Sequence, residues 1–137
     1  HQADNPFTSG ERIEMIHLAL SDHGIGRDRY QVIPVADVEM HSVWVAHIES
    51  LCPPFDVVYG NEPLTSELLR ERGFDVRKIP FFRREIYSGT EFRRRVLDGE
   101  DWRELVPEPV GDFMAKRGLI ERIRRLNLSD SLKAPET

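Results

Sequence analysis

The sequence lacks the features that mark secreted, metal-rich and membrane proteins. Its one cysteine, Cys52, can form no internal disulfide and no metal site by itself. No run approaches the roughly 20 apolar residues that a membrane-spanning helix needs, and the first residues form no basic and apolar leader. We therefore expect neither secretion nor a membrane partner, and a reducing cytoplasm as the compartment.

Positive charge is also in short supply. The chain has 19 Lys and Arg against 24 Asp and Glu, so its formal net charge is −5. This balance disfavours nonspecific nucleic-acid binding through bulk charge, and we expect small molecules rather than nucleic acid as partners. With 39% hydrophobic residues among 137, the chain has enough apolar surface for a packed domain.

Helical and strand patterns alternate along the first 80 residues. The predicted elements are a helix over 8–24, a strand over 30–35, a helix from Ser42 to Pro53, a strand over 55–59, a helix from Pro63 to Gly73 and a strand over 74–79. The first helix is predicted from the capping-box spacing of Thr8 and Glu11. Such alternation is typical of a parallel α/β sheet, in which ligands bind at the carboxyl ends of the strands.

The composition changes after Pro80. We predict C-terminal helices rich in arginine from about Pro107 to Leu128 and a flexible tail over 129–137. Residues 1–128 would then form one α/β domain that ends in a helical segment.

The segment YSGTEFRRR, residues 87–95, is the most informative for chemistry. Ser88 or Thr90 can cap the helix that follows, and the free backbone N–H groups of its first turn would then form an anion site. Gly89 would let an anion approach the backbone, and Arg93 can fold back toward the same anion. A capped surface helix with solvated arginines accounts for the same residues, so the local pattern leaves two interpretations open.

Trp44 follows the predicted strand over 30–35 and so lies near its carboxyl end. There an aromatic ring can stack on a planar ligand, with His41 beside it. Trp44 also has helical spacing with Ile48, which fits an ordinary core side chain, and His41 could be a simple loop residue.

Candidate metal ligands are few. His41 and His47 lie six residues apart with no third ligand near in sequence, which does not fit a structural zinc site. Asp37 and Glu39 could coordinate Mg²⁺ or cap a turn. We predict no metal site built from protein side chains.

Four segments, taken together, resemble the archaeal-type nicotinamide-nucleotide adenylyltransferases of the nucleotidylyltransferase superfamily. They are NPFTSGER at 5–12, Trp44, PPFD with VY over 53–59, and YSGTEFRRR at 87–95. The resemblance implies a Rossmann-like doubly wound parallel sheet with a C-terminal helical segment, and a homo-oligomer. It also implies that ATP, accompanied by Mg²⁺, reacts with nicotinamide mononucleotide (NMN) to give NAD and pyrophosphate.

The resemblance also implies a set of site residues. The superfamily's S-x-T-x-x-R signature, which holds the triphosphate at a helix N-terminus, falls on Ser88, Gly89, Thr90 and Arg93. Arg93 would be catalytic, because it supplies positive charge to the transition state. Trp44 falls on the residue that stacks against the nicotinamide ring, and His41 stands where relatives usually have an Asn that contacts the carboxamide.

The chain departs from the family pattern in two places. The family opens with a strand and a loop whose histidines contact the phosphates; we expect this segment to precede His1, and the 137 residues alone to be molten or aggregation-prone. The second departure is Gly60-Asn61-Glu62, where relatives usually read S-G-N. These departures leave two alternatives: a nucleotidyltransferase of the same fold with another phosphate-bearing acceptor, and a non-catalytic nucleotide-binding module.

Overall fold

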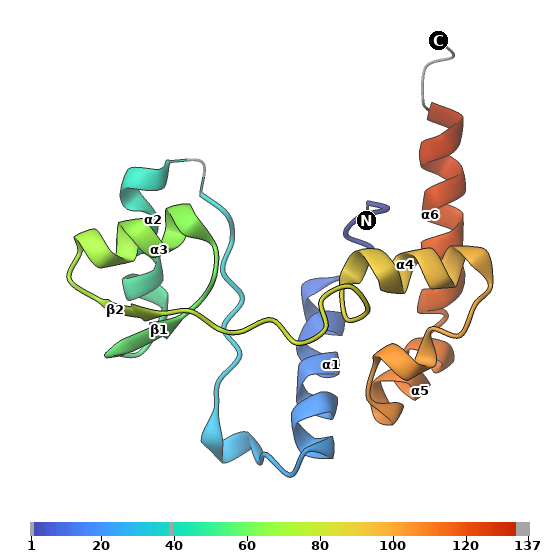
Figure 1. Ribbon diagram of the computed structural model, residues 1–137, viewed down its shortest axis with the longest axis horizontal. Helices are drawn as coiled ribbons and strands as arrows, with labels where there is room; N and C mark the ends of the chain where they lie inside the picture. Colours follow the sequence, from blue (N-terminus) through green and yellow to red (C-terminus); the bar gives the residue numbers. More distant parts are fainter. Residues whose placement is uncertain (1, 39, 134–137) are drawn as a thin grey trace. The chain divides into compact units, whose positions relative to one another are not determined.

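Two units make up the structure, a computed structural model that describes residues 2–38 and 40–133. The first unit joins the residues up to Gln31 to those from Phe82 onward, and the second is Val32–Phe81 (Figure 1). Helices dominate the first unit, whereas the second contains a pair of parallel strands.

The first unit is built from four α-helices and two short 3₁₀-helices in the described residues. In chain order they are α1 Ser9–Asp22, η1 Arg27–Arg29, α4 Gly89–Asp98, η2 Arg103–Leu105, α5 Glu108–Lys116 and α6 Leu119–Lys133. Helix α5 packs against both α1 and α6, and α4 packs against α6 (Figure 1). Residues separated by most of the chain therefore share one core.

Helix α1 begins where the capping-box spacing predicted. The Thr8 hydroxyl accepts a hydrogen bond from the Glu11 N–H at 3.1 Å, and the Glu11 carboxylate accepts one from the Thr8 N–H at 2.8 Å. The helix stops just before Gly24, whose φ of +75° is the left-handed conformation that favours glycine. The prediction of this helix is confirmed.

The core of the first unit lies between its three C-terminal helices. Its buried side chains are Val96 of α4, Val110 and Met114 of α5, and Leu119, Ile120 and Ile123 of α6. The predicted C-terminal helices are thus present as α5 and α6, and Gly118 with φ +67° turns the chain between them. Helix α6 also runs to Lys133, so residues 129–133 are helical rather than part of a tail.

The second unit contains a strand–helix–strand motif preceded by a helix. Its elements are α2 His41–Leu51, β1 Val57–Tyr59, α3 Pro63–Glu71 and β2 Asp75–Arg77. The two strands pair in parallel, with Val57 opposite Asp75 and Tyr59 opposite Arg77. Parallel neighbours need a crossover connection, which α3 provides. The mixture of helices with a small parallel sheet agrees with the predicted α/β class.

The strand predicted over 30–35 is wrong. Residues 30–35 belong to no strand, and β1 pairs with β2 alone among the residues described. A short β-branched apolar run favours extended backbone, but a strand also requires a neighbour that satisfies its N–H and C=O groups. In the described part of the chain, this segment has no such neighbour.

No helix in the described ranges combines the length and the apolar content needed to cross a bilayer.

Candidate functional site

The N-terminus of α4 has the form that the phosphate-binding interpretation requires. Ser88, rather than Thr90, is the capping residue: its hydroxyl accepts a hydrogen bond from the Glu91 N–H at 3.2 Å. The N–H groups of Gly89 and Thr90 come before the first intrahelical hydrogen bond and meet no acceptor among the described residues. Two backbone donors with the positive end of the helix dipole are therefore available to an anion.

Arg93 folds back onto this first turn. A Cβ atom placed on Gly89 would lie 3.0 Å from Nη1 of Arg93 and 3.8 Å from its Cζ. A side chain at position 89 would therefore require the guanidinium to shift by a few tenths of an ångström. The guanidinium and the two free N–H groups lie at the same end of α4.

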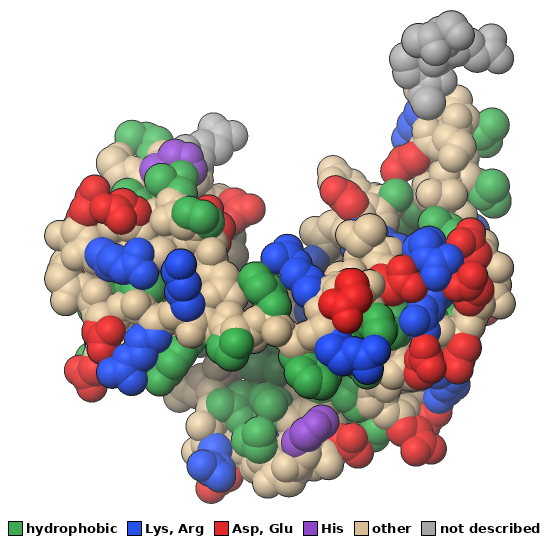
Figure 2. Space-filling view, in the orientation of Figure 1, with side chains coloured by type: hydrophobic (Ala, Val, Ile, Leu, Met, Phe, Trp, Pro, Cys, Tyr) green, Lys and Arg blue, Asp and Glu red, His purple; other side chains and the backbone are tan. Residues whose placement is uncertain are grey.

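Arg93 differs from the two arginines that follow it. Arg94 forms ion pairs with Glu91, Asp98 and Glu100, and Arg95 pairs with Glu91 and Glu104. Figure 2 shows acidic and basic side chains side by side on the part of the surface that carries these pairs. Arg93, which is partly buried, has no ion pair or hydrogen bond within the described structure. No carboxylate therefore neutralises the charge of Arg93 in the described part of the chain.

The ion pairs also affect the titration of Glu91. Hydrogen bonds from Arg94 first, and then from Arg95, lower the pKa of Glu91 from 4.5 to about 2. Glu91 is therefore anionic over the whole physiological range, and its charge is neutralised by Arg94 and Arg95 rather than by Arg93.

A cavity of about 410 Å³ opens at this end of α4. Tyr87, Ser88, Gly89, Phe92 and Arg93 line it from the α4 side; Asp4, Pro6, Phe7, Arg12, Leu105 and Val106 complete it. The cavity brings together three predicted residues, Ser88, Gly89 and Arg93. It adds Arg12 of α1, which the sequence offered only as the last letter of the NPFTSGER segment.

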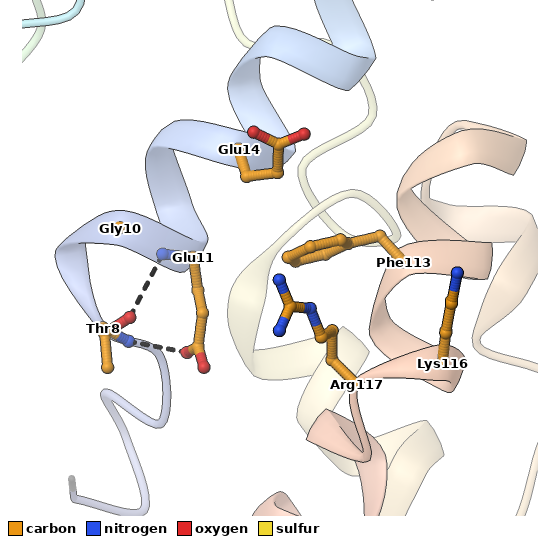
Figure 3. Close-up of a pocket in the computed structure, with 7 residues that line it drawn as sticks. All are labelled: Thr8, Gly10, Glu11, Glu14, Phe113, Lys116 and Arg117. Carbon is orange, nitrogen blue, oxygen red and sulfur yellow. Dashed lines mark hydrogen bonds between the residues drawn. The ribbon is translucent and has the colours of Figure 1, made fainter.

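A larger cavity of about 710 Å³ lies between α1 and α5 and contains none of the predicted site residues (Figure 3). Its Glu11 carboxylate caps α1 and also pairs with Arg122 of α6 at 2.7 Å. That hydrogen bond from Arg122 is the main cause of the lowered pKa of Glu11. Arg117 lies over the Phe113 ring, with its Cζ 5.6 Å from the ring centroid. Glu11 and Arg117 therefore serve helix packing, and we do not assign a site here.

Trp44 and His41 lie on the first turns of α2 in the second unit. His41 is exposed and Trp44 is partly buried, and no aromatic ring within the described structure contacts the Trp44 indole. Val45, the next residue along the chain, is the buried residue of this helix. His47, for which the sequence predicts no role, has its Nε2 atom buried without a hydrogen-bond partner in the described structure.

The residues that depart from the family pattern after β1 have structural roles. The Asn61 side chain donates a hydrogen bond to the Ile79 carbonyl at 2.6 Å and accepts one from the Ile79 N–H at 2.8 Å. Glu62 caps α3 by accepting from the Leu64 N–H at 3.1 Å and from the Thr65 N–H. Hydrogen bonds from Thr65 are the main cause of the lowered pKa of Glu62, and nearby His41 adds a smaller attraction.

Metal ligands do not cluster in the described ranges. No group of three or more His, Cys, Asp or Glu side chains is placed to hold a metal ion there. Two carboxylates were considered as Mg²⁺ ligands. Asp37 has no cluster of further ligands around it in the described residues, and Glu39 lies outside them.

Comparison with known proteins reveals close relatives, although no family model matches the chain. The nicotinamide-nucleotide adenylyltransferase of Methanothrix thermoacetophila is 46% identical over 130 residues, which are 95% of this chain and 75% of that protein. The protein of the same name from Methanosarcina mazei is 46% identical over 131 residues, 96% of this chain and 74% of its own length. That from Pyrococcus furiosus is 43% identical over 136 residues, 97% of this chain and 72% of its own.

Proposed function

The chain belongs to the nicotinamide-nucleotide adenylyltransferase family, and on that premise we propose that it transfers the AMP moiety of ATP to NMN, giving NAD and pyrophosphate. The observation that carries the proposal is the N-terminus of α4. There Ser88 caps the helix, two backbone N–H groups are free, and the unpaired Arg93 guanidinium lies against Gly89.

The proposed chemistry needs positive charge and alignment more than it needs a protein nucleophile. A phosphate oxygen of NMN attacks the α-phosphorus of ATP, the bond to the β-phosphate oxygen breaks, and pyrophosphate leaves with the negative charge. The free N–H groups of Gly89 and Thr90 and the guanidinium of Arg93 would hold the triphosphate and stabilise the charge that develops on the leaving group. Alignment of the two phosphates supplies much of the remaining rate enhancement.

Mg²⁺ is proposed to enter with ATP rather than to sit in a protein site. Mg²⁺ keeps several waters and is commonly held by substrate phosphates, so it needs few protein ligands. When bound, the ion would screen the charge of the triphosphate.

The acceptor would be recognised from the second unit. We assign the nicotinamide ring to Trp44, whose indole contacts no other ring among the described residues, and the carboxamide to the exposed His41. We also assign the parallel β1–α3–β2 motif to a Rossmann-like doubly wound sheet, since such sheets are built from units of this kind. A homo-oligomer remains part of the proposal on family grounds alone.

Two ATP analogues test the reaction type in the full-length protein. The bond broken lies between the α- and β-phosphates, so an analogue with a β,γ-imido bridge should still yield NAD from NMN, whereas an α,β-methylene analogue should not. NAD is measured by enzymatic reduction to NADH.

Nicotinic acid mononucleotide, offered in competition with NMN, tests which acceptor the protein uses. Product formation only with a different acceptor would favour the alternative nucleotidyltransferase, and no product with any acceptor would favour a non-catalytic module.

A further inference from the structure

Arg12 reaches the cavity at the N-terminus of α4 from a different helix. It lies on α1, and its side chain lines the same 410 Å³ cavity as Ser88, Gly89 and Arg93 of the α4 turn. The cavity is therefore bounded by two arginines that come from opposite ends of the first unit's sequence.

The charge of Arg12 is not neutralised by a carboxylate. Its hydrogen bond goes to the side-chain Oδ1 of Asn5, an uncharged acceptor, and no ion pair involves Arg12 in the described residues. In the same unit Arg94, Arg95, Arg103 and Arg122 all pair with carboxylates. Arg12 and Arg93 thus lack the carboxylate partner that these four arginines have.

The contact with Asn5 also orients the Arg12 guanidinium. Asn5 is fixed by two backbone hydrogen bonds with Gln2, at 3.0 and 3.3 Å. An acceptor held in this way fixes one edge of the guanidinium and leaves its other N–H donors free, which reduces the entropy lost when an anion binds. Asp4 lines the same cavity, so two positive charges stand against one negative charge.

We propose that Arg12 is a second phosphate-binding residue of this site, contacting the triphosphate of ATP together with Arg93 and the α4 N-terminus. The proposal rests on the proposed function for the identity of the nucleotide. The ligand class that two such arginines recognise is a polyphosphate. Its several negative charges need more than one cation, and its oxygens accept paired hydrogen bonds from the N–H groups of a guanidinium.

Inorganic tripolyphosphate is the probe, and isothermal titration calorimetry of the full-length protein is the measurement. Arg12→Ala should weaken tripolyphosphate binding about tenfold or more, the loss of a charge-assisted contact. Arg12→Lys should recover part of the affinity, and Asp4→Asn should tighten binding because it removes a like charge. Arg125→Ala is the matched control: Arg125 is an exposed helical arginine of the same unit that lines neither cavity.

Activity separates this proposal from the proposed function. If the wild type makes NAD, Arg12→Ala should raise the KM for ATP and leave the KM for NMN within about twofold. If the wild type makes no NAD but binds tripolyphosphate in an Arg12-dependent manner, the proposed function fails and the phosphate role of Arg12 stands. If the wild type and Arg12→Ala bind tripolyphosphate with equal affinity, the proposed role of Arg12 is overturned. Should Arg12→Ala fail to fold, Arg12→Lys and Asp4→Asn decide, and wild-type affinity in both overturns the proposal.

Discussion

The two units differ in how much of their apolar surface they bury. In the first, six side chains from α4, α5 and α6 form one buried cluster, with Val96 and Leu119 fully inaccessible. In the second, Val45 and Leu69 are the buried hydrophobic side chains of the described residues, while Tyr59, Ile79 and Phe81 are exposed. Buried apolar area is the main stabilising contribution to folding. The residues proposed to bind phosphate therefore lie in the well-packed unit, and Trp44 and His41 lie in the sparsely packed one.

Helix α4 shows how the first unit joins packing to chemistry. Val96 lies one turn beyond Arg93 and is buried in the core, which fixes the helix that carries the arginine. Arg94 and Arg95 of the same helix form ion pairs with carboxylates. Arg93 is thus carried by a helix that is anchored in the core, an arrangement that suits the electrostatic role proposed for it.

The largest effect should come from the core of the first unit. Leu119→Ala removes a fully buried side chain from the six-residue cluster, and Leu69→Ala removes one of equal size that is 2% exposed in the second unit. Leu→Ala costs about 2–5 kcal/mol in buried positions, and more where the surroundings cannot collapse. We expect the loss of unfolding free energy to lie near the top of this range for Leu119→Ala and near the bottom for Leu69→Ala. Urea denaturation measures both. A larger loss for Leu69→Ala would reverse the comparison.

Loss of Arg93 should come next and should affect catalysis rather than folding. Arg93→Ala should lower kcat by about 10²–10³-fold, the effect of removing one donor to developing charge. Arg94→Ala is the matched control, because the Arg94 guanidinium already forms ion pairs with three carboxylates. It should leave kcat within about threefold, because solvent-exposed ion pairs contribute little. Equal losses of kcat in the two variants would mean that the pairing pattern on α4 does not select the catalytic arginine.

The second unit should affect acceptor binding. Trp44→Ala should raise the KM for NMN by about tenfold, in line with about 1–3 kcal/mol for aromatic stacking, and leave the KM for ATP unchanged. Trp44→Phe should retain most of the affinity because it keeps an aromatic face. A parallel rise in both KM values, with a lower melting temperature, would instead assign Trp44 to packing.

The features that could be predicted from the sequence are those decided within one helical turn. The capping box of Thr8 and Glu11 and the Ser88 cap each depend on residues three apart, so their spacing is visible in the sequence. The fold-back of Arg93 over Gly89 is equally local. The β1–α3–β2 motif was also predicted, since its strands and helix have distinct periodicities.

The features that could not be predicted depend on partners distant in sequence. The segment 30–35 has strand composition but no neighbouring strand in the described part of the chain, and composition alone does not reveal that. Local spacing also gave no reason to expect that Arg95 would pair with Glu104, beyond the end of α4, or that Arg12 would line the cavity of Arg93. Tertiary contacts decide these outcomes.

The smallest effect concerns pH and the ion pairs of α4. The pKa of Glu91 is lowered to about 2 in the folded protein from an ordinary value of 4.5, so its pairing stabilises the fold above pH 4.5 and is lost as the pH falls from 4.5 toward 2. Glu91→Gln should therefore flatten the dependence of melting temperature on pH across this window. Glu67→Gln is the control, because Glu67 is an exposed glutamate of the second unit without an ion pair in the described structure. The control should retain the wild-type slope; if it flattens the profile as much as Glu91→Gln does, the acid sensitivity does not originate in α4.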